Sequence, residues 1–161
     1  KISTKNLRKT FDTKVLSTKA VDIIRNLEEY KAAEHVMIYY PIEYEIDFRG
    51  LLRDKKNFYL PKVCGGDLSV CPYCNKLIKS DLNIFEPCTK PVSPNVLDFI
   101  VVPALMADSK NYRLGYGGGF YDKFLPECKN AFSVCVVEKS LYVEKLQVEK
   151  FDFRLNKVIV V

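Results

Sequence analysis

Residues 98–103, with the sequence DFIVVP, carry the clearest β-strand signal in this chain of 161 residues. Their apolar run stops at Pro103, as expected of a strand that is buried on both faces and ends at a residue without an N–H donor. Residues 35–40 (HVMIYY), followed by Pro41, repeat the pattern, and residues 131–137 and 158–161 predict two further strands. Continuous apolar strands of this kind are typical of a parallel sheet that is covered on both faces.

Segments with a helical spacing of apolar residues separate these strands. Leu7, Phe11 and Val15 recur every four residues and predict a first helix. Ser17 or Thr18 is expected to cap a second helix. The core face of that helix would consist of Ala20, Ile23, Ile24, Leu27 and Tyr30. Further helices are expected over residues 45–55, 120–125 and 141–148.

The middle of the chain is less regular. Residues 57–60 predict a strand that ends at Pro61, and residues 68–73 predict another within the irregular stretch 63–95. Strands that alternate with helices, without a repeat or a linker, indicate one α/β domain over residues 1–161. We expect a three-layer α/β/α domain with a mostly parallel sheet, whose ligands bind at the carboxyl ends of the strands.

The composition is that of an ordinary globular protein, with 48% hydrophobic and 28% charged residues. The net charge of +5 is concentrated in the first twenty residues, which hold six basic residues and one acidic residue. Such a segment indicates either an anionic partner or a solvated helix face. Because no apolar run approaches the ~20 residues of a membrane span and the N-terminal residues lack a secretory pattern, we expect a cytoplasmic protein.

Six cysteines raise the question of disulfides or a metal site. A disulfide framework is not expected in a chain without a secretory signal. Cys71 and Cys74 could form half of a zinc site completed by Cys64 and Cys88, but the outer spacings do not form two close pairs. Buried, reduced thiols are therefore the expectation. His35, at the start of a strand, is assigned no role.

A glycine-rich loop carries the strongest chemical signal. Gly115, Gly117, Gly118 and Gly119 fall within five positions, with Arg113 just before them and an expected helix just after them. Glycines let several backbone N–H groups approach one anion. A helix N-terminus and an arginine fork also favour phosphate. The alternative is a flexible turn. The spacing matches neither a Walker A loop nor the dinucleotide-binding fingerprint.

Residues 113–125, RLGYGGGFYDKFL, resemble the signature of the 5-formyltetrahydrofolate cyclo-ligase family, also called 5,10-methenyltetrahydrofolate synthetases. The resemblance extends over nearly the whole chain. The other matching segments are Lys5 and Arg8 in KNLRK, residues 40–51, Leu60-Pro61, residues 84–87, residues 98–103 and Asp152.

The resemblance implies an ATP-dependent, Mg²⁺-requiring ring closure that forms 5,10-methenyltetrahydrofolate, ADP and phosphate. In that family the formyl oxygen is thought to attack the γ-phosphate, after which nitrogen-10 closes on the carbon and phosphate leaves. Phosphoryl transfer of this kind depends mainly on positioning and charge neutralisation. The implied ATP contacts are Lys5, Arg8, Arg113, Leu114, Gly115, Tyr116, Gly117, Gly118, Gly119, Phe120 and Tyr121.

The resemblance also implies the remaining roles. Arg113 and Tyr121 would be catalytic, Glu45 and Tyr121 would bind the folate, and Asp122 and Asp152 would hold Mg²⁺. The plainer alternatives are a helix-end acid for Asp122, a surface loop acid for Asp152 and a surface helix residue for Glu45. Because Lys5 and Arg8 are spaced by three rather than four residues, Lys1 or Lys9 could replace Lys5.

The expected partners are small molecules, namely ATP and 5-formyltetrahydrofolate with or without a polyglutamate tail. We expect a monomer with no nucleic-acid or membrane partner. One alternative function is a non-catalytic nucleotide- or folate-binding relative. Another is a small basic nucleic-acid-binding protein, which is disfavoured because aromatic residues do not alternate with the N-terminal basic residues.

Overall fold

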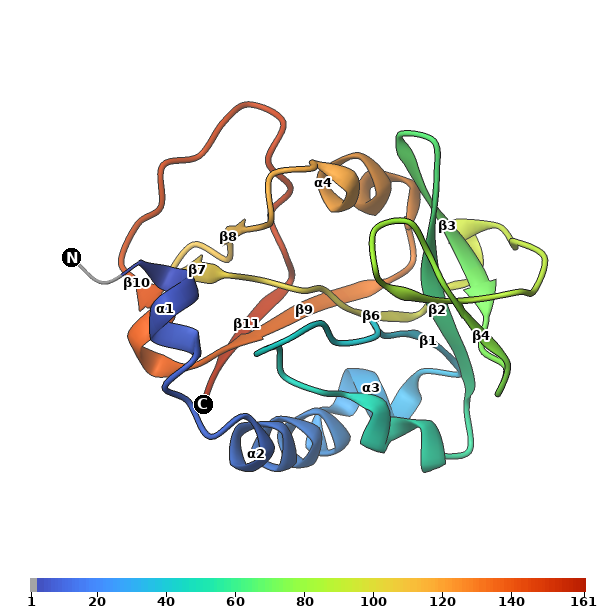
Figure 1. Ribbon diagram of the computed structural model, residues 1–161, viewed down its shortest axis with the longest axis horizontal. Helices are drawn as coiled ribbons and strands as arrows, with labels where there is room; N and C mark the ends of the chain where they lie inside the picture. The colour runs from blue at the N-terminus through green and yellow to red at the C-terminus, as the bar shows by residue number, and fades with distance from the viewer. Residues whose placement is uncertain (1–2) are drawn as a thin grey trace.

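A six-stranded sheet runs through the middle of the molecule in the order β11-β9-β6-β1-β2-β3 (Figure 1). The computed structural model describes residues 3–161. The pairs β1–β2, β1–β6, β6–β9 and β9–β11 are parallel, whereas β2 and β3 form an antiparallel hairpin. The strands are β1 (His35–Met37), β2 (Asn57–Cys64), β3 (Asp67–Pro72), β6 (Phe99–Val101), β9 (Phe132–Val137) and β11 (Lys157–Val160). The mixed α/β class and the mostly parallel sheet expected from the sequence are confirmed.

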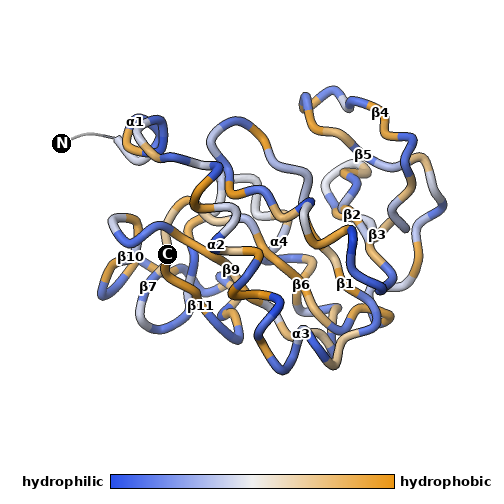
Figure 2. The backbone as a smooth tube through the Cα atoms, turned by 90° about the horizontal axis from the view of Figure 1, so that it is seen from below, coloured by the Kyte–Doolittle hydropathy of each residue, from blue (hydrophilic) through white to orange (hydrophobic). Residues whose placement is uncertain are grey.

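Helices cover one face of the sheet, below it in Figure 1. They are α2 (Thr13–Asn26), α3 (Glu28–Ala32) and the 3-10 helix η1 (Arg49–Arg53). Ile24, Phe48 and Leu51 from this layer are fully buried against Val36 and Phe99 of the sheet. Figure 2 shows hydrophobic residues along the central strands and hydrophilic ones in many peripheral turns.

The other face carries α4, above the sheet in Figure 1, together with short strands and loops. Its core joins Met37, Ile100 and Cys135 of the sheet to Phe124 and Leu141. Its elements are α1 (Thr4–Arg8), β7 (Met106–Asp108), β8 (Arg113–Leu114), α4 (Phe120–Phe124), η3 (Leu125–Glu127), η4 (Lys139–Leu141) and β10 (Tyr142–Val143). Beyond the sheet edge lie β4 (Leu77–Lys79), β5 (Phe85–Pro87) and η2 (Pro94–Val96).

All six expected strands are present, although β1 and β6 are shorter than their apolar runs. The expectation that Pro61 ends its strand is wrong, because β2 continues to Cys64. Strand β1 pairs with β2 only as far as Tyr59. Beyond that residue β2 pairs only with β3 on its other side, so a residue without an N–H is tolerated there.

The N-terminal helices differ from the expectation. Leu7, Phe11 and Val15 do not share a helix, because α1 ends at Arg8 and α2 begins at Thr13. Asp12 caps α2 by accepting the Val15 N–H, so Ser17 and Thr18 are not caps. Of the expected core face, Ala20, Ile24 and Tyr30 are buried, whereas Ile23 is exposed.

Two expected helices are absent from the described residues. Only the 3-10 helix Arg49–Arg53 forms within residues 45–55, since the preceding loop includes Tyr44 at a positive φ of 66°. Residues 141–148 form the end of η4, then β10, then a loop, because Tyr142 and Val143 pair with β7. In both places tertiary contacts override a weak helical pattern.

All six cysteines are free thiols, of which Cys71, Cys128 and Cys135 are buried and Cys64 and Cys88 are exposed. The expectation of buried thiols therefore holds for the first three and is wrong for the last two. Within residues 3–161, no three His, Cys, Asp or Glu side chains are grouped to hold a metal ion. The same residues include no helix with the length and hydrophobicity that a membrane span requires.

Candidate functional site

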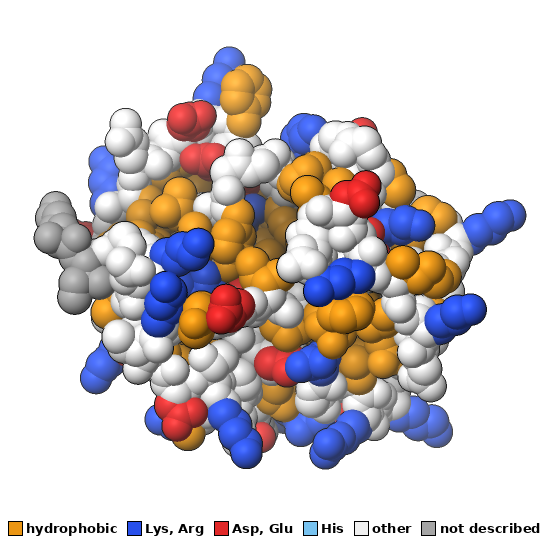
Figure 3. Space-filling model, viewed as in Figure 1, with side chains coloured by type: hydrophobic (Ala, Val, Ile, Leu, Met, Phe, Trp, Pro, Cys, Tyr) orange, Lys and Arg blue, Asp and Glu red, His pale blue; other side chains and the backbone are white. Residues whose placement is uncertain are grey.

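A cavity of about 820 Å³ lies at the carboxyl ends of β1, β2 and β6. Tyr39 follows β1, Val63 belongs to the end of β2 and Pro103 follows β6, and all three line the cavity. The space-filling view shows hydrophobic side chains around a hollow on this face (Figure 3). Its position is the one that parallel α/β sheets generally use for ligands.

The glycine loop between β8 and α4 forms one wall of the cavity. Gly117 and Gly119 have φ angles of +96° and +66°, in the left-handed region that side chains disfavour. Gly118 needs its small size for another reason, because a Cβ atom there would lie 2.7 Å from the Phe120 ring. The loop therefore has a backbone path that other residues would strain.

Arg113 lies beneath this loop, with a side chain that is only 4% exposed. Its Nη2 is 3.6 Å from Asp122 Oδ1, and the guanidinium lies 5.6 Å from the centre of the Tyr121 ring. Its Nε is buried without a hydrogen-bond partner. A buried donor that lacks a partner costs free energy, so this guanidinium has unused capacity for an anion in the cavity.

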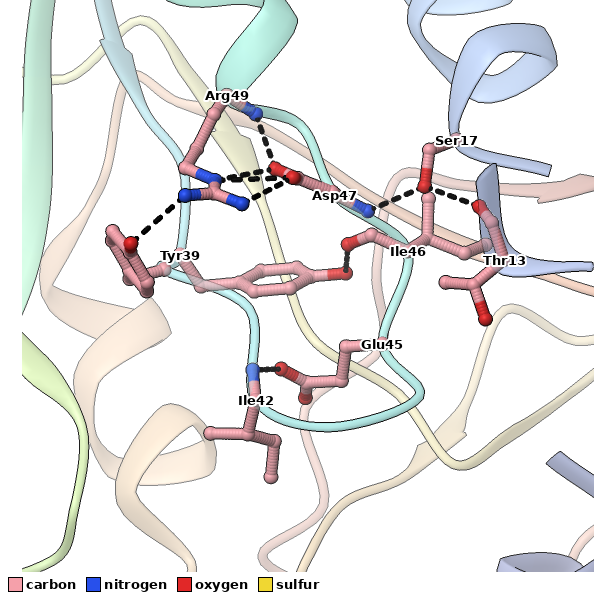
Figure 4. A network of polar contacts seen from close by, with 9 residues as sticks. Thr13, Ser17, Tyr39, Ile42, Glu45, Ile46, Asp47 and Arg49 are labelled. Carbon is pink, nitrogen blue, oxygen red and sulfur yellow. Dashed lines mark hydrogen bonds and ion pairs between the residues drawn. The ribbon is translucent and has the colours of Figure 1, made fainter. Parts of the chain in front are cut away.

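Glu45 also lines the cavity, in a buried position. Its Oε2 accepts the Ile42 N–H at 2.8 Å, as Figure 4 shows. Burial raises the pKa of Glu45, while hydrogen bonds from Ile42 and from the Tyr116 hydroxyl and the charge of Arg8 act in the opposite direction. The expected alternative of a surface helix residue is wrong for Glu45, which is buried in a loop.

Arg8 supports Glu45 through Tyr116. Its Nη1 donates to the Tyr116 hydroxyl at 2.6 Å, and its Nη2 donates to the Tyr44 carbonyl at 2.9 Å. The Tyr116 hydroxyl in turn acts on the nearby Glu45 carboxylate, whose pKa it lowers. This chain of contacts joins α1, the glycine loop and the Glu45 loop, which are far apart in the sequence.

A polar network holds the Glu45 loop in place (Figure 4). The Tyr39 hydroxyl donates to the Ile46 carbonyl at 3.0 Å, and the Asp47 N–H donates to Ser17 Oγ at 2.9 Å. Arg49 forms an ion pair with Asp47 at 2.7 Å. Because these partners come from three segments, the position of Glu45 depends on the assembled fold.

Two carboxylates on the cavity wall suit a hard cation. Asp122 Oδ1 accepts the Phe153 N–H at 3.0 Å, and Asp152 Oδ2 accepts the Glu149 N–H at 2.7 Å. Each carboxylate keeps a second oxygen for a ligand. Mg²⁺ is usually held by one or two carboxylates together with phosphates and waters, so this pair fits such an ion.

The model of the 5-formyltetrahydrofolate cyclo-ligase family matches residues 3–161. The chain belongs to this family. A 5-formyltetrahydrofolate cyclo-ligase of Haemophilus influenzae is 30% identical, with 84% of this chain and 80% of that protein covered. The cyclo-ligase of Escherichia coli K12 is 31% identical, with 79% and 78% covered.

Solved structures agree with this membership. The NMR structure of Aquifex aeolicus 5,10-methenyltetrahydrofolate synthetase has a TM-score of 0.79 and 31% identity, covering 91% of this chain and 78% of that one. A Mycoplasma pneumoniae 5,10-methenyltetrahydrofolate synthetase, at 18% identity and a TM-score of 0.62, shares the fold. The cyclo-ligase resemblance expected from the sequence is confirmed.

The cavity brings together most of the residues that the cyclo-ligase resemblance implied. Glu45, Asp152 and all residues of the stretch 113–122 line it. Arg8 is instead buried behind Tyr116, and Lys5 is exposed on α1 outside the lining. Lys1 lies outside the described residues.

Glu86 is a cavity residue that sequence reasoning missed. It is 8% exposed, lines the cavity, and accepts the Val63 N–H at 2.7 Å through Oε2. The sequence placed it in the family-like segment 84–87 but gave it no role. Tyr39 and Tyr40 also line the cavity, but the sequence presented them as part of a buried strand.

Proposed function

We propose that this cyclo-ligase family member converts 5-formyltetrahydrofolate to 5,10-methenyltetrahydrofolate and consumes ATP, with release of ADP and phosphate. One observation carries the proposal: Arg113, with its buried and unpartnered Nε, and buried Glu45 line the same cavity. A volume of about 820 Å³ lies within the range of small-molecule sites.

The wall formed by Arg113 and the glycine loop would take the ATP phosphates. The loop needs almost no side-chain volume, and Arg113 supplies a planar fork that matches phosphate oxygens. Leu114, Tyr116 and Phe120 line the same wall and would contact the nucleotide. Lys5 would reach ATP from α1, whereas Arg8 would act by holding Tyr116.

The wall around Glu45 would take the pterin ring, whose N–H donors suit a carboxylate. Tyr121 lies next to Arg113, and the charges of both Arg113 and Glu45 act on its hydroxyl. Burial raises the pKa of Tyr121, so its hydroxyl stays protonated and can donate to the oxygen that carries charge during transfer. This gives Tyr121 the catalytic role that the family resemblance implied.

Asp122 and Asp152 would hold Mg²⁺, each through the oxygen that its backbone contact leaves free. When bound, the ion would neutralise phosphate charge. We further propose that the protein acts as a cytoplasmic monomer, without nucleic-acid or membrane partners.

The test is direct because 5,10-methenyltetrahydrofolate absorbs in the near-ultraviolet, away from its precursor. Purified protein with ATP, Mg²⁺ and 5-formyltetrahydrofolate should produce this absorbance together with one phosphate per turnover. Binding of both ligands without absorbance change would instead identify a non-catalytic relative. Omission of ATP or Mg²⁺ in parallel reactions tests each co-substrate separately.

A further inference from the structure

Asp108 is a completely buried carboxylate at the end of β7, outside the set of residues that line the cavity. Its Oδ1 accepts the N–H groups of Lys110 at 2.9 Å and Tyr112 at 3.0 Å. Its Oδ2 accepts the Leu146 N–H at 2.9 Å. A buried carboxylate is costly unless it is well bonded, and here both oxygens are occupied by backbone donors.

The first two donors belong to the turn between β7 and β8, which we call the anchor turn (residues 108–112). The Asp108 N–H also donates to the Tyr112 carbonyl at 2.9 Å, and the turn contains Asn111 at a φ of 67°. Arg113 is the next residue, and it pairs with Ala107 across the two strands. Asp108 therefore sets the geometry of the turn that presents Arg113 to the cavity.

The third donor belongs to the cavity loop (residues 144–156), the long connection between β10 and β11 in Figure 1. This loop contributes Leu146, Glu149 and Asp152 to the cavity wall. It has no regular secondary structure, so its position must come from contacts with other segments.

Several of those contacts are with the anchor turn, and others join Phe153 to Asp122 and Asn156 to Ser133. Ser109 Oγ donates to the Glu144 carbonyl at 2.7 Å, and Arg154 Nε donates to the Lys110 carbonyl at 2.8 Å. Farther along, the Leu155 N–H donates to the carbonyl of Asn111 at 2.9 Å. Among these hydrogen bonds, the one from the Leu146 N–H is accepted by the buried carboxylate of Asp108.

We propose that Asp108 is a positioning residue that keeps Arg113 and the cavity loop with Asp152 in fixed relation to each other. Its effect on ATP rests on the proposed function, whereas the connection between turn and loop does not. An amide cannot replace this carboxylate, because one end of an amide is itself a donor. Asp108→Asn would place that donor against the N–H of Leu146 or against those of Lys110 and Tyr112.

The first measurement is native-state hydrogen exchange of Asp108→Asn without ligands. We expect faster exchange at the Leu146 or Tyr112 amide and throughout the cavity loop. The second measurement is the KM for ATP, which should rise about tenfold or more, the factor that corresponds to a lost hydrogen bond to a charged group. The Mg²⁺ concentration for half-maximal activity should rise with it, because Asp152 moves with the loop.

A matched control is Asp98→Ala. Asp98 Oδ2 accepts the Glu34 and His35 N–H groups at the amino end of the sheet, opposite to the cavity. Its removal should lower the melting temperature but leave the KM for ATP and the exchange of Leu146 unchanged. A similar rise in the KM for ATP in both variants would overturn the proposal, since general destabilisation would then explain it.

A double-mutant cycle separates positioning from stability. Asp108→Asn should raise the KM for ATP less in an Arg113→Ala background than in the wild type, because it acts through Arg113. We expect the two fold-increases to differ by about twofold or more. Fully additive effects would contradict the proposal.

If Asp108→Asn does not fold, the double variant S109A/R154A weakens the same connection from exposed positions. It should loosen the cavity loop and raise the KM for ATP in the same direction. Faster hydrogen exchange in the cavity loop with an unchanged KM for ATP would overturn the proposal. Unchanged hydrogen exchange in the cavity loop would also overturn it. Absence of ATP turnover in the wild type would refute the proposed function, and the exchange measurement would still decide the connection.

Discussion

Arg113 and Asp122 face each other across the glycine loop, with 3.6 Å between Nη2 and Oδ1. This separation is too long for a hydrogen bond, although the Arg113 side chain is nearly inaccessible to solvent. The arginine therefore keeps donors for an anion, and the aspartate keeps an oxygen for a cation. Opposite charges at this distance attract each other without using the full hydrogen-bonding capacity of either group.

Replacing Arg113 should weaken ATP binding. Arg113→Lys keeps the charge but loses the planar fork, and Arg113→Ala loses both. We expect the KM for ATP to rise about tenfold or more for Ala, since a charged hydrogen bond contributes roughly 1.5–3 kcal/mol. Because the side chain is buried, Ala should also lower the melting temperature. Arg25→Lys, which alters a surface pair with Asp54, is the control. An unchanged KM in both Arg113 variants would exclude the phosphate role.

The glycine loop should tolerate no side chain at Gly117 or Gly118. Gly117→Ala would strain a positive φ at a cost of about 1 kcal/mol or more, and Gly118→Val would collide with the Phe120 ring. Calorimetric titration should detect no ATP binding by Gly118→Val and weaker ATP binding by Gly117→Ala. The control is Gly66→Ala, whose Cβ would meet only Lys123 Nζ at 3.6 Å. Normal ATP binding by Gly118→Val would show that the glycine loop is a turn without a role in phosphate binding.

Glu45→Gln should reduce folate affinity and leave ATP affinity unchanged, because it keeps the shape but removes a charged acceptor. Burial raises the pKa of Glu45 above its ordinary value of 4.5 in the folded state. Its protonated form therefore contributes stability below pH 4.5 that is lost as the pH rises through the folded-state pKa. As the pH rises through this pKa, the melting temperature of the wild type should fall relative to that of the variant, which has no carboxyl group to titrate at this position. A difference in melting temperature between the two proteins that stays constant from about pH 4 to about pH 8 would contradict the raised pKa of Glu45.

Tyr116→Phe should show that Arg8 acts on Glu45 through a hydroxyl. The hydrogen bond from Tyr116 lowers the pKa of Glu45, so its loss should raise that pKa further. The acid side of the pH profile for folate KM should then move to higher pH. Tyr142→Phe, at a half-exposed position on β10, serves as the control. An unmoved profile would mean that the contact is purely structural.

Asp122→Asn should raise the Mg²⁺ concentration needed for half-maximal activity and lower turnover. Asn keeps one oxygen for the Phe153 N–H, so the substitution tests charge more than packing. If Asp122 only stabilised the start of α4, the change would cost about 0.3–1 kcal/mol of stability and leave the Mg²⁺ titration unaltered. That second result would leave Asp152 as the metal ligand, which Asp152→Asn would then test.

Local patterns predicted much of the sheet and one wall of the site. The buried strands around Ile100 and Val134 were predictable because a continuous apolar run has few alternatives to burial. The prediction of a helix over residues 45–55 was wrong. Hydrogen bonds of Glu45, Asp47 and Arg49 with residues outside this segment outweigh its helical spacing. The gap between α1 and α2 was missed because Asp12 was not recognised as a cap.

The α/β class, the family and the glycine loop could be predicted from the sequence, because they depend on residues that are close in the chain. The burial of Glu45 in the same cavity as Arg113, and the bond from Arg8 to Tyr116, are visible only in the folded chain. The same holds for Asp108, whose partners lie both in its own turn and 38 residues away. Burial and hydrogen-bond partners belong to pairs of distant segments, so they arise only when the chain is folded.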